Sequence, residues 1–215
     1  MTTGILTLLR RLKIVPIITI DDAERAVPLA DALVAGGLSC AEVTFRTPAA
    51  VEALRRIAVE RPDVLIGAGT VLTPEQAAIA KSAGARFILS PGLNRRVVAW
   101  CQEHDMPIFP GVATPTDIEM ALEQGLDVVK FFPAEQIGGL AYLRAVAAPF
   151  PSLEFMPTGG INAKNVSEYL AFDRVVACGG SWMAPQSWIA AGAFDRIRDA
   201  ARESLDAVRP TPSSR

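Results

Sequence analysis

The sequence has little of the residues from which metal sites and disulfides are built. Its 215 residues include one histidine, His104, and three cysteines, Cys40, Cys101 and Cys178. A zinc cluster or a binuclear centre built from several histidines is therefore excluded. The cysteines are too few and too widely spaced for a disulfide framework or for CxxC metal chemistry. We interpret them as small core residues of a protein in a reducing compartment.

Lysine is also scarce, and the chain has no basic excess. Only four of the 21 basic residues are lysines, at positions 13, 81, 130 and 164, and the formal net charge is -2. This balance argues against nucleic acid as the main partner. No apolar run approaches membrane-spanning length, and the basic residues near the N-terminus follow the apolar stretch, unlike those of a signal peptide. We expect a cytoplasmic protein that binds no membrane.

The organisation of the chain predicts one domain. Half of the residues are apolar, which is enough for a substantial core. Residues 1–13 show the spacing of a short amphipathic helix, which we expect to pack on the body of the protein. Residues 14–208 form the expected domain, and residues 209–215, with Pro210 and Pro212, form an expected C-terminal tail.

Within residues 14–208, β-rich runs alternate with helical patterns eight times. Eight βα units without a long linker predict an α/β fold of the (β/α)8 TIM barrel type, preceded by the short N-terminal helix. A doubly wound open sheet is the alternative, although the glycine-rich dinucleotide fingerprint is missing after the first strand. The expected strands are Ile14–Ile20, Leu38–Phe45, Val64–Gly69, Arg86–Leu89, Pro107–Phe109, Asp127–Phe131, Leu153–Pro157 and Arg174–Cys178.

Lys130 stands within an apolar strand, where an ammonium group is either extended to water or deliberately buried. If Val129 and Phe131 face the surrounding helices, Lys130 points into the barrel. Burial disfavours the charged form of a lysine, which would leave the amine free to attack a carbonyl and form a Schiff base. The strand alone leaves a second interpretation equally open, namely a buried lysine paired with a carboxylate. The other three lysines lie on helices or before the first strand.

The second strand places polar side chains on its inner face. Glu42, Thr44 and Arg46 alternate with Val43 and Phe45. A buried Glu42 could serve as general base and acid, and the planar fork of Arg46 suits a carboxylate or a phosphate. A structural ion pair of Glu42 with Arg46 or with Lys130 is the alternative interpretation.

Glycine-rich segments follow three of the expected strands. Gly67–Thr70 would let a ligand approach the backbone, but alone it is a weak signal of ligand contact, because glycines at strand ends are often turn requirements. The loops 157–162 and 179–182 follow the last two strands, where barrels of this class commonly bind phosphate. We therefore predict phosphate binding there, and two ordinary glycine turns remain the alternative.

Six ordered motifs at strand ends resemble those of the Schiff-base aldolases that act on 2-keto-3-deoxy-6-phosphogluconate (KDPG). The resemblance spans most of the chain. It implies Lys130 as the Schiff-base lysine, Glu42 as the proton-transfer residue, and Arg46 with Thr70 as the clamp on the pyruvate carboxylate. It also implies a homotrimer that needs no metal or cofactor. The motifs are 42–47, 67–71, 90–92, 130–135, 157–161 and 179–182, and the implied phosphate-binding positions are Thr158, Gly159, Gly160, Gly180 and Ser181.

Pro91 and Phe132 are expected to line the substrate pocket, although Phe132 could equally be a core residue. The implied substrate is a phosphorylated 2-keto acid, and the galactonate analogue and 4-hydroxy-2-oxoglutarate are alternatives. Two other classes remain open at this point. A phosphosugar isomerase or epimerase on the same barrel would not need Lys130. A noncatalytic phosphate binder would not need Lys130, Glu42 and Arg46 together.

Overall fold

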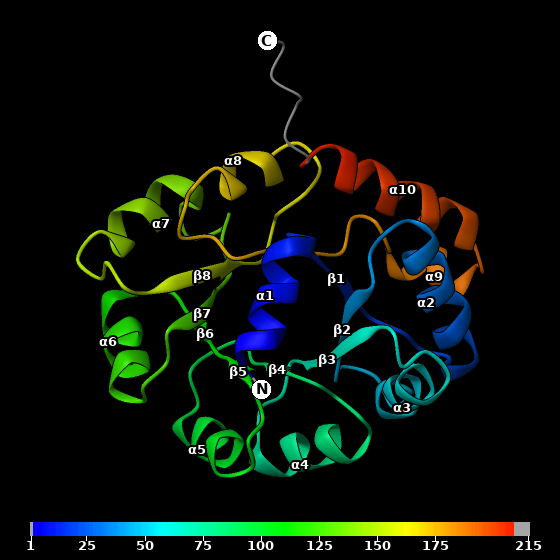
Figure 1. Cartoon of the computed structure of the whole chain (residues 1–215), viewed down its shortest axis with the longest axis horizontal. Coiled ribbons are helices and arrows are strands. Elements are labelled where there is room, and N and C mark those ends of the chain that lie inside the picture. The colour runs from blue at the N-terminus through cyan, green and yellow to red at the C-terminus, as the bar shows by residue number, and fades with distance from the viewer. Residues whose placement is uncertain (1, 209–215) are drawn as a thin grey trace.

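The computed structural model of the protein describes residues 2–208, so the expected tail at 209–215 lies outside the described residues. It is an α/β fold in which helices surround a curled parallel sheet (Figure 1). The strands are β1 (Ile14–Ile18), β2 (Cys40–Thr44), β3 (Leu65–Gly69), β4 (Ile88–Leu89), β5 (Ile108–Phe109), β6 (Gly111–Val112), β7 (Val128–Phe131), β8 (Glu154–Pro157) and β9 (Cys178–Gly180).

The helices follow the strands around the outside of the sheet. After α1 (Thr2–Leu12) and the 3-10 turn η1 (Ala23–Arg25) come α2 (Ala26–Ala35), α3 (Ala50–Glu60), α4 (Pro74–Ser82), α5 (Arg95–Glu103), α6 (Pro115–Glu123), α7 (Gly139–Ala147), α8 (Val166–Leu170), α9 (Gln186–Ala190) and α10 (Phe194–Asp206). No helix within residues 2–208 is long and apolar enough to cross a membrane.

All strand pairs are parallel, and they form two sheets. The larger has the order β5-β4-β3-β2-β1-β9, and the smaller has the order β6-β7-β8. Pro110 separates β5 from β6, because proline has no N–H for the ladder. The expected strand Pro107–Phe109 is therefore followed by a second short strand, β6, that lies beyond the predicted bounds. Single parallel bridges, Phe155 to Val175 and Thr158 to Gly179, connect β8 to the last strand segment. The regular part of that segment begins at Cys178, later than the sequence predicts.

Two apolar clusters hold these layers together. The larger lies between the strands and the outer helices, and it contains Val43, Val129 and Phe131. The smaller fills the inside of the curled sheet, where Leu9 of α1 meets Val128 and other inward-facing side chains. Helix α1 thus covers the end of the sheet at which the strands begin, across the centre of the view in Figure 1.

Local capping explains where several helices begin. Thr114 accepts a hydrogen bond from the N–H of Asp117, whose carboxylate accepts one from the N–H of Thr114, so α6 starts with a complete capping box. At α4, Thr73 accepts from the N–H of Gln76 at 3.2 Å, but the Gln76 amide oxygen accepts from the N–H of Leu72. The second bond of the capping box at α4 is therefore made by the N–H of Leu72, one residue before the N-cap Thr73.

Candidate active site

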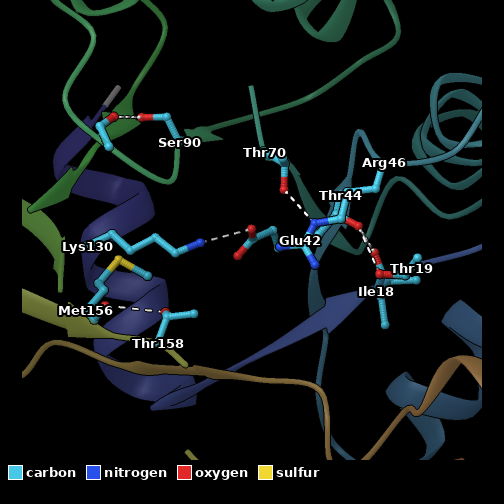
Figure 2. A network of polar contacts seen from close by, with 11 residues as sticks. Ile18, Thr19, Glu42, Thr44, Arg46, Thr70, Ser90, Lys130, Met156 and Thr158 are labelled. Atoms are coloured by element: carbon cyan, nitrogen blue, oxygen red, sulfur yellow. Dashed lines mark hydrogen bonds and ion pairs between the residues drawn. The ribbon is translucent and has the colours of Figure 1, made fainter. Parts of the chain in front are cut away.

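The candidate site lies where the inward-facing polar side chains of β2 and β7 meet. Lys130 on β7 and Glu42 on β2 point toward one another across the inside of the sheet (Figure 2). Nζ of Lys130 lies 3.3 Å from Oε1 of Glu42, and the two residues are only 5% and 1% exposed. The strand alternation predicted from the sequence places them there, since Val129 and Phe131 pack outward.

Glu42 has one oxygen committed and one free. Oε2 of Glu42 is buried and has no hydrogen-bond partner within the described residues. A buried carboxylate oxygen without a donor costs free energy unless something else bonds to it. Because a buried ion pair is itself a weak source of stability, the arrangement is better explained by chemistry at this oxygen.

Gly69 makes room for this pair, and Gly111 makes room for a neighbouring loop. A Cβ at Gly69 on β3 would lie 1.9 Å from Oε1 of Glu42, so only glycine leaves space for the carboxylate. Gly111 pairs with Lys130, and a Cβ there would lie 2.0 Å from the carbonyl oxygen of Pro91. The backbone of Pro91 therefore lies against β6, which pairs with β7. The sequence indicates Gly69 only as a possible ligand contact. Its contact with Glu42 is seen only in the folded structure.

Arg46 and Thr70 lie together just beyond the ends of β2 and β3. Nε of Arg46 donates a hydrogen bond to Oγ1 of Thr70 at 3.2 Å, and the Arg46 side chain is exposed. Thr70 has a φ of 58°, a left-handed conformation that is strained for a β-branched residue. Such strain is typical of positions where a side chain is held for function. The guanidinium N–H groups remain available for an anionic ligand.

The loops after β7, β8 and β9 bring the remaining predicted residues together. Thr158 is buried next to Gly179, with which it forms a bridge. Gly159 and Gly160 have φ values of 98° and 78°, which explains why glycine occupies both positions. Ser181 is exposed and follows directly on Gly180, which leaves room for the Trp182 ring.

Phe132 follows Lys130 by two residues on the same face of the chain. Nζ of Lys130 lies 5.4 Å from the centre of the half-buried Phe132 ring, within the range of a cation–π contact. Two cavities, of about 380 and 550 Å³, lie away from this site, beside α1 at the end of the sheet where the strands begin. They are lined by apolar and surface side chains. His104 borders one of them, away from Lys130, and its ring stacks on Trp100.

The fold and the site together define a class: a parallel α/β protein whose polar site lies at the carboxyl ends of its strands, around a buried lysine. Within that class, residues 5–200 match the family model described as KDPG and KHG aldolase, and the chain belongs to this family. A 2-dehydro-3-deoxy-phosphogluconate aldolase of Treponema pallidum is 54% identical over 200 residues, covering 93% of this chain and 95% of that protein.

Solved structures agree with this membership. A KDPG aldolase from Legionella pneumophila, with pyruvate captured as a covalent carbinolamine intermediate, has a TM-score of 0.89 and 42% identity, covering 92% of this chain and 96% of the other. The aldolase of Zymomonas mobilis ZM4, with 3-phosphoglycerate, has a TM-score of 0.85 and 40% identity, covering 93% and 94%.

Proposed function

We propose that the protein is a Schiff-base aldolase that cleaves 2-keto-3-deoxy-6-phosphogluconate to pyruvate and D-glyceraldehyde 3-phosphate. The observation that carries the proposal is Lys130, the buried lysine held 3.3 Å from a buried carboxylate. The carbinolamine in the Legionella relative supports the same chemistry. An isomerase or epimerase would not need this lysine, and a noncatalytic binder would not need the pair.

The reaction follows from the positions of the two groups. Nζ of Lys130 gives a proton to Glu42 and adds to the C2 ketone, and Glu42 then returns that proton to the carbinolamine hydroxyl, so that water leaves and an iminium ion remains. Glu42 takes the proton of the C4 hydroxyl, the bond between C3 and C4 breaks, and its electrons move to the iminium nitrogen. The aldehyde is released, Glu42 returns the proton to C3 of the enamine, and water hydrolyses the imine to free pyruvate and Lys130. We assign the pyruvate carboxylate to Arg46 and Thr70.

The phosphate group of the substrate is assigned to the loops after β8 and β9. In these loops, backbone N–H groups and side-chain hydroxyls donate hydrogen bonds to the phosphate. The residues are Thr158, Gly159, Gly160, Gly180 and Ser181. The 3-phosphoglycerate in the Zymomonas relative supports a phosphorylated ligand. The names of the matched relatives favour the gluconate compound over its galactonate analogue, and 4-hydroxy-2-oxoglutarate is a second substrate by family.

At the level of architecture, we propose that residues 14–208 close into one (β/α)8 barrel as a single domain. The bridges from β8 to the last strand segment, and the single residue between β5 and β6, support closure on both sides of the smaller sheet. We also propose a homotrimer, in keeping with the family resemblance. Light scattering on the purified protein should then give three times the mass of one chain.

Reductive trapping tests the activity. The protein is incubated with pyruvate and borohydride, digested, and its peptides are analysed by mass spectrometry. We expect a reduced pyruvate adduct on Lys130 in the native protein and none in Lys130→Arg. The control is Lys164→Arg, at an exposed lysine that lies in the turn before α8 and not on a helix as the sequence predicted, and this variant should be trapped as well as the native protein. An adduct on any other lysine, or no adduct, contradicts the proposal.

A further inference from the structure

Two threonine hydroxyls meet at the ends of β1 and β2, beside the candidate site (Figure 2). Thr44 is completely buried, and its Oγ1 donates a hydrogen bond to the carbonyl oxygen of Ile18 at 2.9 Å. Oγ1 of Thr19 lies 3.1 Å from Oγ1 of Thr44. A hydroxyl has one proton, and Thr44 donates its proton to Ile18. Thr19 must therefore be the donor in the hydrogen bond between the two hydroxyls.

The direction of this bond decides what Thr19 can still do. Its proton is directed at Thr44, so its remaining hydrogen-bonding capacity is that of an acceptor. Within residues 2–208 this hydroxyl makes no other hydrogen bond. Thr19 is only partly buried, and it borders a cavity of about 120 Å³ together with Asp21 and Gln186. A ligand atom that meets this hydroxyl must therefore donate the hydrogen bond.

The position of Thr19 lies between the two halves of the site. Strand β1 is flanked by β2, which carries Glu42, and by β9, which ends at Gly180. Ile17 pairs with Glu42 and points toward Thr158 and Gly179. Since side chains two residues apart share a face, Thr19 extends from the same face, one step nearer the mouth.

We infer that Thr19 determines specificity by accepting a hydrogen bond from the C5 hydroxyl of the substrate. This inference rests on the proposed function. The substrate has two hydroxyl groups on its carbon chain, at C4 and C5, and the C4 hydroxyl gives its proton to Glu42. The C5 hydroxyl is the remaining donor, and it lies between the bond that breaks and the phosphate.

The synthetic direction of the reaction tests this role. Pyruvate is combined either with D-glyceraldehyde 3-phosphate or with 3-oxopropyl phosphate, which lacks only the hydroxyl that becomes the C5 hydroxyl. We expect Thr19→Val to lower kcat/KM for the first aldehyde by roughly two- to tenfold, the worth of one hydrogen bond, and to leave the second nearly unchanged. Thr19→Ser keeps the hydroxyl and should restore the preference. Thr116→Val, at an exposed threonine on α6, is the matched control.

The ratio of kcat/KM for the two aldehydes distinguishes a lost contact with the C5 hydroxyl from a general disturbance of the site. A general disturbance of the site by Thr19→Val would lower both activities equally, and equal losses overturn the inference, as does an unchanged ratio. Pyruvate trapping on Lys130 is measured in parallel. If the native protein is trapped and the ratio does not move, only the role of Thr19 fails; if the native protein is not trapped, the proposed function fails.

Discussion

At the scale of single residues, the site depends on how Glu42 is held. Lys130 contacts one carboxylate oxygen, Gly69 makes space beside it, and the other oxygen has no protein donor within the described part of the chain. The free oxygen is the one that can reach a substrate hydroxyl or a water molecule. In the proposed reaction, Lys130 is therefore the nucleophile and Glu42 transfers the protons.

Replacement of Glu42 by glutamine keeps the size of the side chain and removes its ability to take a proton. We expect Glu42→Gln to lower kcat for cleavage by about a hundredfold or more. Borohydride trapping of pyruvate on Lys130 should persist, because Schiff-base formation needs the amine. Exchange of the pyruvate methyl protons with deuterium, followed by NMR, should be slowed as much as cleavage, and exchange at the native rate would contradict the assigned role.

The residue scale is also where the sequence predicts most. Alternation along a strand is enough to place Glu42 and Lys130 on the inner faces of β2 and β7. The same pattern cannot show which glycine adjoins which side chain, so Gly69 was interpreted only as a possible ligand contact. Nor can it give the direction of the hydrogen bond between Thr19 and Thr44. That direction follows from the hydrogen bond that Thr44 donates to the carbonyl oxygen of Ile18.

At the scale of elements, the loops after β7 and β8 are joined into one unit. The N–H groups of Ala134 and Glu135 donate to the carbonyl oxygens of Thr158 and Gly159 at 2.8 and 3.1 Å. The hydroxyl of Tyr169 on α8 donates to the Glu135 carboxylate. Burial, together with the adjoining Glu135 carboxylate, raises the pKa of Tyr169, so the hydroxyl keeps its proton and remains a donor.

Tyr169→Phe removes this bond and leaves the ring in place. We expect a loss of about 1.5–3 kcal/mol in the free energy of unfolding, as for a hydrogen bond to a charged group. Because Gly159 belongs to the joined loops, KM for KDPG should rise, while trapping of pyruvate at Lys130 stays at the native level. Tyr142→Phe, at the other tyrosine, is the control. A larger effect on pyruvate trapping than on KM would refute the role of the loops.

Predictability at the element scale depends on how local the signal is. The start of α6 is encoded within Thr114–Asp117 and was predictable from those residues. The split of one strand at Pro110 and the late start of β9 at Cys178 depend on pairing with distant strands. Sequence patterns therefore indicate that these strands exist, but they do not fix where regular pairing begins and ends.

At the scale of the whole molecule, the three cysteines are buried and free, as the sequence predicted. Burial raises the pKa of the Cys40 thiol from 9.0 to about 12, and burial also raises the pKa of Cys178. An unfolded thiol thus loses its proton first as the pH rises. The contribution of each thiol to stability is complete below its unfolded pKa and is lost as the pH rises toward its folded pKa.

We therefore expect the free energy of unfolding to fall in alkaline solution, by about 1 kcal/mol per fully buried thiol near pH 10. Urea unfolding at about pH 8 and about pH 10 measures the difference. Cys40→Ala costs stability at both values through the cavity it leaves, but the decrease between them should be smaller than in the native protein. An identical decrease in the variant would contradict the expectation.

Helix α1 and the smaller apolar cluster cover the end of the curled sheet at which the strands begin. Every molecule that takes part in the reaction must therefore use the opening at the carboxyl ends of the strands. In the proposed reaction, pyruvate is attached to Lys130 above this cluster, and the aldehyde lies between it and the solvent. The water that hydrolyses the last imine enters by the path along which the aldehyde leaves, so slow departure of the first product delays recovery of the free enzyme.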